Sequence, residues 1–565
     1  MVNKNEFFER NLLALSKRNP ELCSRLRIIG GKINFYEFRE TRTGEIIPAL
    51  PDSTGKAHPL HSMMDPRKEA GRLISTVENE SFLVLLGLGG AYYAEAALER
   101  DDIGTVIVIE YNLNGLAELL REIDYTHLFA DPRFFLLADA TESELEEIVL
   151  GLYQPILCGG IRVIPIRSRT SQDPKRFNMA AGAIQAAIDR ISADYTVQAH
   201  FGKRWLSNIV RNLKNVKFTD MNLPQIYRAA VTAAGPSLSK QIPDLRKKRK
   251  CLFLIATDTS LPCLLYEGLT PDAVISIDCQ HISYYHFMHG LPEEVILFLD
   301  LASPPLLSTL SKRHRYFSTG HPLTRYISRH WKTFPALDTS GGNVTYAAMS
   351  LAEQLGAREI EIYGADFSYP GGVSYARGAY IYTLFEKSQN RFSPLEAQYS
   401  AFLYRTLLSK KNLSDNSWYY ETGILKFYRE RLEEKSKKMK TAIIAAPGLG
   451  APIYTGLKTN GIPEPNQNGN SEIAGKIVFK TSCDSDKNTA IKAGDFLDLY
   501  LDLIVNLPKP GKNASDYFAL LNDNERELFT TLLPLAAALK QDKNPASFAE
   551  LFEEIKAYCE SQIRA

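Results

Sequence analysis

An alternation of strand-like and helical segments between residues 226 and 367 constrains the fold most strongly. Short runs rich in Val, Ile, Leu and Phe recur there, and helical patterns separate most of them. The strand-like runs are residues 227–234, 251–258, 273–278, 294–300, 315–320 and 359–367. Strands that alternate with helices in this way form a parallel sheet with helices on both faces. We therefore predict an α/β fold whose centre is a Rossmann-like, doubly wound parallel sheet.

Small and polar residues stand where these strands end. They are Gly235, Pro236 and Ser237, then Asp258, Asp278 and Asp300, and finally Gly364, Ala365 and Asp366. A further loop with Ser340, Gly341 and Asn343 opens the helical segment 344–355. Because ligands of doubly wound sheets bind beyond the carboxyl ends of the strands, these residues predict a nucleotide or sugar cleft. The alternative for each of them is an ordinary strand terminator or helix cap.

Two of these loops suit an anion. Gly235–Ser237 and Thr339–Gly341 each precede a helix, where free N–H groups and the positive end of the dipole favour a phosphate or carboxylate. Neither is a Walker A loop, because the pattern G-x-x-x-x-G-K-[ST] does not occur. ATPase or GTPase chemistry of the P-loop kind is therefore disfavoured.

The rest of the chain predicts a multidomain protein, because 565 residues exceed what one hydrophobic core usually holds. We expect an N-terminal helix with short strands at 1–80 and a Rossmann-like α/β domain at 81–200. A central catalytic domain follows at 201–440. A linker at 441–470 precedes a C-terminal helical domain at 471–565.

Composition excludes several partners and compartments. The 66 basic and 65 acidic side chains give a formal net charge of +1, so no nucleic-acid partner is predicted. The longest apolar run, residues 82–95, is too short to span a bilayer, and the first residues lack the apolar core of a signal peptide. The seven cysteines are never spaced C-x-x-C, so neither a disulfide framework nor a thiolate zinc site is expected. We predict a cytoplasmic protein without a metal site.

The segment from Gly364 to Tyr375 resembles the bacterial sialyltransferases that use CMP-activated sialic acid. Those enzymes have a G-N-G-P-S loop after the first strand, an S-G loop before a late helix, and a strand ending G-x-D-F. Two tyrosines spaced by six then follow, as Tyr369 and Tyr375 do here. A longer resemblance includes NLLAL, GLGG, FGKRWLSNIVRNL, AAGPSLSK and PDAVISID. On these motifs nearly the whole chain resembles the motility accessory factor family, whose members are similar to flagellin glycosyltransferases that attach nonulosonic acids.

The resemblance implies roles for particular residues. The backbone around Gly235, Pro236 and Ser237 would hold the nucleotide, with Asp258 and Asp278 beside the ribose and cytosine. Ser340 and Gly341, with Asn343 next to them, would meet the sugar carboxylate. Tyr369 and Tyr375 would donate hydrogen bonds to the leaving phosphate, with packing aromatics as the alternative. The implied partners are a CMP-nonulosonic acid donor and flagellin, whose Ser or Thr hydroxyl would attack directly, and no cofactor is required.

Two departures from the sialyltransferase pattern matter. Ala233 and Ala234 replace the opening Gly-Asn of the first loop. The sialyltransferases also place a histidine base after the tyrosine loop, whereas the last histidine here is His330. The candidates for a base are Asp366, Glu421 and His281, and Asp366 could instead be a structural cap or a donor ligand.

Weaker features leave alternatives open. Gly87, Gly89 and Glu110 resemble half of a dinucleotide site, but Tyr92 replaces the third glycine, which favours a scaffold domain. The competing functions are a pterin diphosphokinase, whose archaeal forms share a similar central domain, and a non-catalytic flagellin-binding chaperone. The particular sugar, the acceptor hydroxyls and the oligomeric state stay open at this level.

Overall fold

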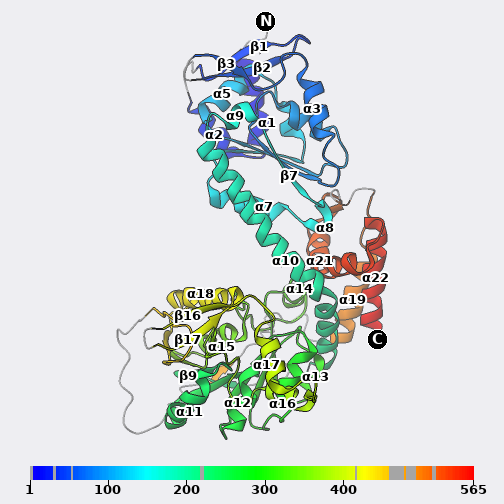
Figure 1. Ribbon diagram of the computed structural model, residues 1–565. Helices are drawn as coiled ribbons and strands as arrows, with labels where there is room; N and C mark the ends of the chain where they lie inside the picture. Colours follow the sequence, from blue (N-terminus) through cyan, green and yellow to red (C-terminus); the bar gives the residue numbers. More distant parts are fainter. Residues whose placement is uncertain are drawn as a thin grey trace. The chain divides into compact units, whose positions relative to one another are not determined.

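The computed structural model describes residues 4–29, 34–52, 55–216, 222–413, 416–456, 476–478, 492–511, 514 and 517–565 (Figure 1). The chain forms two compact units. Unit 1 comprises Met1–Gly202, Asn506–Phe529 and Leu533–Ala557, and unit 2 comprises Lys203–Val505, Thr530–Leu532 and Tyr558–Ala565. The segment between residues 457 and 475, which includes residues 457–470 of the predicted linker, lies outside the described residues.

A seven-stranded parallel sheet forms the centre of unit 2, as the sequence predicts. Its strands are β9 (Arg228–Thr232), β10 (Phe253–Thr257), β11 (Ala273–Ser276), β12 (Ile296–Asp300), β13 (His314–Phe317), β14 (Glu359–Tyr363) and β18 (Ala442–Ala445). Their order is β13-β12-β11-β10-β9-β14-β18, and every neighbouring pair is parallel. The chain thus builds outward from β9 to β13 and then returns to the other side of β9. The strand order reverses between β9 and β14, where a doubly wound sheet has its ligand crevice.

Helices and 3₁₀ turns join these strands. They are α11 (Ser237–Lys248), η1 (Arg249–Cys251), η2 (Asp258–Ser260), α12 (Leu261–Tyr266), η3 (His281–Phe287), α13 (Pro305–Ser308), α14 (Pro322–His330), α15 (Val344–Gln354) and α18 (Gly423–Lys438). Helix α15 packs on β9, β10 and β11. Its residues 345–352 are all buried, and Ala347, Ala348 and Ala352 allow this close packing because their side chains are small.

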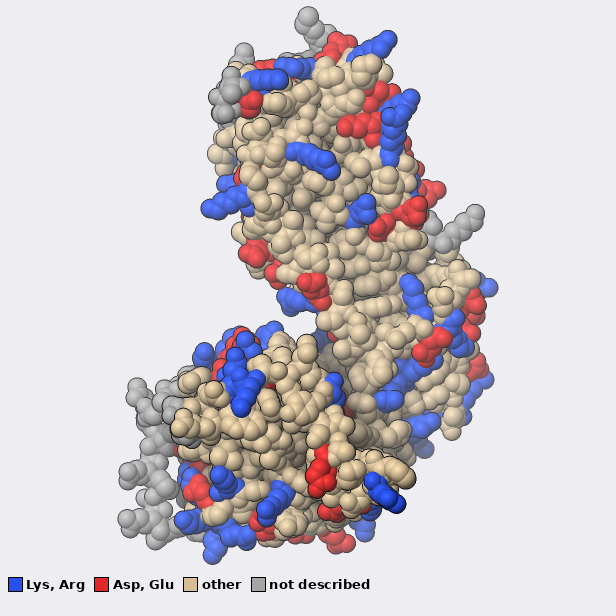
Figure 2. Space-filling model, in the orientation of Figure 1, with Lys and Arg blue, Asp and Glu red and all other residues tan. Residues whose placement is uncertain are grey.

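Helix α18 shows how the outer layer of unit 2 divides between core and solvent. Leu432 is fully buried in the core. On the solvent side, Lys426 pairs with Glu430 and Arg431 pairs with Glu434. Figure 2 shows the resulting blue and red side chains next to one another over this helix. Such exposed pairs contribute little stability, so the apolar face holds the helix in place.

Strand β18 differs from the sequence prediction, which puts residues 441–470 in a linker. Residues 442–445 form the last strand of the sheet and pair with β14, with Ile443 opposite Ile360. The run Ala-Ile-Ile-Ala is short, and it lies among Pro and Gly residues that are typical of a loop. An edge strand needs only one partner, so four residues are enough here.

A small antiparallel sheet lies between β14 and β18 in sequence. It consists of β15 (Tyr369–Pro370), β17 (Trp418–Glu421) and β16 (Ser409–Asn412), in that spatial order. Helices α16 (Tyr380–Ser388) and α17 (Leu395–Leu403) connect β15 to β16. A two-stranded pair, β8 (Asn222–Pro224) with β19 (Lys476–Val478), completes the strands of unit 2.

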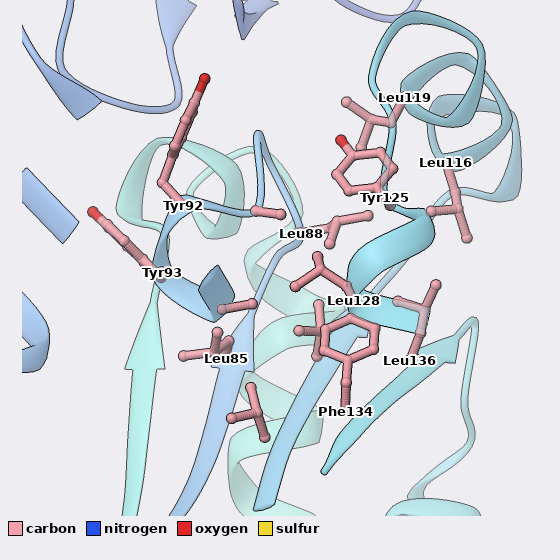
Figure 3. Packing of buried hydrophobic residues seen from close by; sticks show 14 of the residues in the cluster. Leu85, Leu88, Tyr92, Tyr93, Leu116, Leu119, Tyr125, Leu128, Phe134 and Leu136 are labelled. Atoms are coloured by element: carbon pink, nitrogen blue, oxygen red, sulfur yellow. The ribbon is translucent and has the colours of Figure 1, made fainter. Parts of the chain in front are cut away.

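Unit 1 contains its own parallel sheet, in the order β6-β5-β4-β7. The strands are β4 (Phe82–Leu86), β5 (Thr105–Glu110), β6 (Phe134–Ala138) and β7 (Ile161–Pro165), and a meander of β1 (Glu37–Glu40), β2 (Ile46–Pro51) and β3 (Ala57–Pro59) precedes them. Figure 3 shows Leu85, Leu88, Tyr125 and Phe134 packed among residues of α5 (Leu113–Glu122) and α6 (Thr126–Ala130). The α/β domain predicted at the N-terminus is therefore present.

Helices form the rest of unit 1. They are α1 (Lys4–Ser16), α2 (Pro20–Arg27), α3 (Pro66–Ile74), α4 (Tyr92–Leu98), α5 (Leu113–Glu122), α6 (Thr126–Ala130), α7 (Glu142–Leu152), α8 (Pro155–Cys158), α9 (Arg167–Thr170) and α20 (Tyr517–Leu520). The 42-residue helix α10 (Pro174–Asn215) continues into unit 2. From residue 492 on, the described part of the predicted C-terminal segment is mainly helical, with α19 (Ala493–Val505), α21 (Asp523–Lys543) and α22 (Phe548–Arg564), and its residues are divided between the two units.

Candidate functional site

The loops after β9 and β14 meet at the point where the strand order of unit 2 reverses. The N–H of Gly235 donates to the carbonyl of Gly364 at 2.8 Å. A Cβ on Gly235 would lie 2.4 Å from Asp366 Oδ2 and 2.5 Å from the Gly364 carbonyl oxygen. Only a glycine allows the two loops to approach so closely. The structure therefore brings together Gly235, Ser237 and Asp366, which the sequence predicted as site residues.

Asp366 occupies the N-terminus of α11. The N–H of Ser237 donates to Oδ2 of Asp366 at 2.8 Å, and the Ser237 hydroxyl donates to Oδ1. Asp366 is 4% exposed, and burial raises its pKa against the opposing effect of these hydrogen bonds. The first turn of α11, where we expected a phosphate, is thus capped by a carboxylate of the same chain. This geometry corresponds to the structural cap that the sequence left open for Asp366.

A third loop, which follows β18, closes this region. Gln241 links two of the loops, because it accepts from the N–H of Gly364 at 2.7 Å and donates to the carbonyl of Pro447 at 2.8 Å. A cavity of about 290 Å³ lies here, lined by Ser237, Gln241, Asp366 and residues 445–448 and 450–453. The sequence analysis missed this loop. Its signal is nevertheless present, since Ala445 is followed by APGLGAP in the same strand-then-glycine pattern as the other strand ends.

The close approach at Gly235 gives a direct test of this loop geometry. We expect Gly235→Ala to lower the stability of unit 2 by about 1–3 kcal/mol, because the added methyl meets backbone and carboxylate atoms that cannot move freely. Gly423→Ala is the matched control, since no other atom lies within 4 Å of the place that its Cβ would occupy. Thermal unfolding of both variants measures the difference. Equal melting temperatures for the two variants would contradict the geometry described above.

Asp258 and Asp278 differ in what they can contact. Asp258 is 1% exposed, accepts from Ser276 Oγ at 2.6 Å and from the N–H of Thr259 at 2.7 Å. Burial raises its pKa, and the charge of His286 opposes this. Both carboxylate oxygens of Asp258 are therefore engaged inside unit 2. Asp278 is partly exposed and accepts from the N–H of Gln280 at 2.9 Å, so it lies nearer the surface.

The tyrosine loop is anchored at the same crevice. The N–H of Ala376, next to Tyr375, donates to the carbonyl of Ala234 at 2.8 Å. The ring of Tyr375 lies 6.0 Å from the rings of Tyr380 and Phe402, between centroids. Burial raises the pKa of Tyr375, so its hydroxyl is protonated at neutral pH and can donate a hydrogen bond. Tyr369 lies on β15 and pairs with Tyr420 of β17.

Ser340 and Asn343 belong to a separate polar network at the start of α15. Ser340 and Tyr346 both donate to Asp338, and Lys435 donates to Asp338 Oδ2 at 2.8 Å. Burial alone would raise the pKa of Asp338, but the hydrogen bonds from Lys435 and Ser340 hold it well below its usual range. Asn343 caps α15, because its Oδ1 accepts from the N–H of Tyr346 at 3.0 Å.

The Ser340 network borders an open groove. The groove has a volume of about 980 Å³ and also includes Arg358, Arg431 and Lys438 in its lining. Gly341 is required beside it, since a Cβ there would lie 2.1 Å from the Tyr346 ring. The backbone of this loop can therefore pack under Tyr346, while the exposed Ser340 stays accessible to a ligand in the groove.

The corresponding crevice of unit 1 is filled by side chains. Glu110 ends β5 and pairs with Arg169, whose Nε lies 2.8 Å from Glu110 Oε1. The guanidinium also donates to the carbonyl of Tyr111, and both charged side chains are 1% exposed. His61 accepts from the N–H of Gly90 at 2.9 Å, and burial lowers its pKa to about 4. The glycine-rich turn of unit 1 is therefore packed against residues of its own unit.

Comparison with known proteins shows the family and the fold of this chain. A Treponema pallidum (strain Nichols) protein described only as uncharacterized is 34% identical over 166 residues, which are 29% of this chain and 79% of that protein. The chain belongs to the family of this Treponema protein. A second uncharacterized protein of the same organism is 35% identical over 153 residues, 26% of this chain and 54% of that protein. These relatives therefore indicate no activity for this chain.

Two further comparisons concern the central unit and the whole chain. Residues 203–372 match the model of the 6-hydroxymethylpterin diphosphokinase MptE-like family, less than a third of the chain. The solved MAf glycosyltransferase from Magnetospirillum magneticum AMB-1 superposes on 100% of this chain and 95% of its own, with a TM-score of 0.62 and 14% identity. The chain therefore has the fold of that glycosyltransferase. None of the helices in the described ranges is long and apolar enough to cross a membrane.

Proposed function

We propose that this protein is a glycosyltransferase that moves a nonulosonic acid from a CMP-activated donor to Ser or Thr hydroxyls of flagellin. The observation that carries the proposal is the crevice between β9 and β14, where the tyrosine loop is bonded to the loop after the first strand. The similarity of the whole chain to the Magnetospirillum MAf glycosyltransferase supports a sugar-transfer reaction on this fold. We place the reaction in the cytoplasm, where nucleotide sugars are made, and propose no cofactor.

The chemistry that we propose is a direct displacement at the anomeric carbon. The bond from that carbon to the phosphate oxygen breaks, and its electron pair leaves with CMP. Hydrogen-bond donors that are fixed at the leaving phosphate stabilise this charge more in the transition state than in the ground state. The protonated hydroxyl of Tyr375 is one such donor, and Tyr369 is the second. Ser340, in the loop before α15, would hold the sugar carboxylate, and Asp278 would contact the nucleotide.

A second candidate is a pterin diphosphokinase. The match of residues 203–372 to the MptE-like family favours it, since that reaction would use the same sheet edge with ATP and magnesium. The third candidate, a flagellin-binding chaperone, follows if the crevice binds no nucleotide at all.

A thermal-shift titration of the full chain separates these candidates. The ligands are CMP, AMP, GMP and ATP with magnesium, each at increasing concentration. A ligand present at 100 times its dissociation constant stabilises the folded state by about 2.7 kcal/mol, which is readily measured. Selective stabilisation by CMP supports the glycosyltransferase. Stabilisation by ATP with magnesium alone supports the diphosphokinase, and no response together with capture of flagellin supports the chaperone.

A further inference from the structure

Transfer of a sugar to a hydroxyl releases a proton, which a general base normally accepts. The structure disfavours Asp366 and Glu421, the first two candidates for the general base that the sequence offered. Both oxygens of Asp366 are held by Ser237. Glu421 is 8% exposed and pairs with Arg429 at 2.9 Å, so its charge is already compensated. The third, His281, is exposed at the start of η3.

His286 lies on the same 3₁₀ segment, but its surroundings are different. It is 8% exposed, and its Nδ1 is buried without a hydrogen-bond partner among the described residues. Buried polar atoms in folded proteins are nearly always hydrogen-bonded, so an unpaired imidazole nitrogen needs an explanation. Binding or transferring a proton is one such explanation.

The contacts of His286 lead to the tyrosine loop. Its ring packs edge-on against Tyr380, with 4.6 Å between ring centroids, and Tyr380 in turn lies 6.0 Å from Tyr375. Thus His286, which follows β11, shares one aromatic cluster with the residue that we assign to the leaving phosphate.

Charged groups lie around this cluster. The buried carboxylate of Asp258 interacts attractively with His286, and Asp278 adds a second negative charge near Asp258. Arg405 adds a positive charge, which opposes the rise that burial causes in the pKa of Tyr375 and Tyr380. A fixed carboxylate beside a histidine stabilises the imidazolium that forms when the histidine takes up a proton.

The other histidines beyond the carboxyl edge are less well placed. His321 follows the edge strand β13, two strands away from β11, or roughly 10 Å at the usual strand spacing. Burial also lowers its pKa to about 4, which makes it a poor proton acceptor at neutral pH. His314 begins β13 and therefore lies at the opposite edge of the sheet.

We propose that His286 is the general base of the transfer. In this step the acceptor hydroxyl loses its proton to the imidazole, and its oxygen forms the bond to the anomeric carbon. The bond from that carbon to phosphate breaks, and its electron pair leaves with CMP. The proposal rests on the proposed glycosyltransferase function. It gives His286 the role that a histidine after the tyrosine loop has in the sialyltransferases.

The test compares His286→Ala and His286→Gln with the parent chain in transfer from a CMP-nonulosonate to purified flagellin. Removal of a general base lowers kcat by about 10²–10⁴-fold. We expect this loss in both variants, with a normal thermal shift on adding CMP. Added imidazole is expected to restore part of the rate to His286→Ala but none to His286→Gln, where the side chain fills the space. His289→Ala, an exposed histidine of the same segment, is the control and keeps the parent rate.

The outcomes distinguish the two proposals. If the parent chain transfers sugar and His286→Ala transfers it equally fast, the base assignment is wrong and the glycosyltransferase function stands. A slow His286→Ala that binds CMP but does not respond to imidazole also overturns the base role. If the parent chain transfers no sugar from any CMP donor, the proposed function fails, and the base assignment fails with it.

Discussion

Replacing Tyr369 and Tyr375 together by Phe is expected to slow sugar transfer by at least about 10²–10³-fold, the usual effect of losing one preorganised donor to a developing negative charge. Burial keeps Tyr375 protonated, so the hydroxyl is available as a donor at neutral pH. The phenyl rings remain, and with them the packing of position 375 against Tyr380 and Phe402. Transfer kinetics with a CMP-nonulosonate give the loss in kcat, while the thermal shift by CMP is expected to change little.

Two comparisons make this result specific. Tyr266→Phe removes the hydroxyl of a tyrosine that is 66% exposed at the end of α12, and it is expected to keep the parent rate. The single variants Tyr369→Phe and Tyr375→Phe show whether the two hydroxyls act together, in which case their effects are not additive. A double variant with the turnover of the parent would exclude both tyrosines from the mechanism and leave them as packing residues.

Arg169→Ala is expected to destabilise unit 1 by about 3–5 kcal/mol, because it leaves Glu110 as an unpaired charge in the interior. The guanidinium also lies 5.0 Å from the ring centroid of Phe177, so the variant loses packing as well as charge. Hydrogen exchange of the β4 and β5 amides reports on this unit directly. Each 1.4 kcal/mol corresponds to a factor of ten, so protection is expected to fall about 10²–10³-fold or more.

The control for this prediction is an ion pair of the same type at the surface. Arg176 pairs with Asp139 at 3.0 Å, with side chains 50% and 40% exposed. Arg176→Ala is expected to cost at most about 1 kcal/mol. The double variant Arg169→Met/Glu110→Leu is expected to recover part of the stability, because it removes the unpaired charge but also the acceptor of the Leu88 and Tyr111 N–H groups. Equal losses of stability for Arg169→Ala and Arg176→Ala would show that the buried Glu110–Arg169 pair stabilises unit 1 no more than a surface ion pair does.

The central sheet could be predicted because its strands are short apolar runs separated by helical segments. Each run carries its own local signal, and the prediction did not depend on contacts between distant residues. The contact of Ser237 with Asp366 spans 129 residues, and that of Glu110 with Arg169 spans 59. Such pairs follow from strand order and register, which no local pattern encodes. The sequence therefore identified the residues at the crevice and left a structural cap open for Asp366, but it did not identify Ser237 as the residue that Asp366 binds.

The sequence predicted neither the loop after β18 nor a role for His286, and the reasons differ. Composition predicted a linker at residues 441–470, because the many Pro and Gly residues of this stretch hide the signal of only four strand residues. The sequence named His281 of this segment and not His286, since spacing alone cannot separate a buried histidine from exposed ones. The contact of His286 with Tyr380 depends on how η3 packs against a helix that begins 94 residues later.

The composition of unit 1 has a consequence for how the protein is made. This unit requires residues 506–529 and 533–557 in addition to the first 202, so residues 203–505, most of unit 2, are inserted within its sequence. A ribosome therefore releases the residues that complete unit 1 only after nearly all of unit 2 has been synthesised. The early α/β segment lacks the C-terminal helices of its unit until then. Residues 203–505 are thus expected to begin folding on the ribosome before unit 1 is complete.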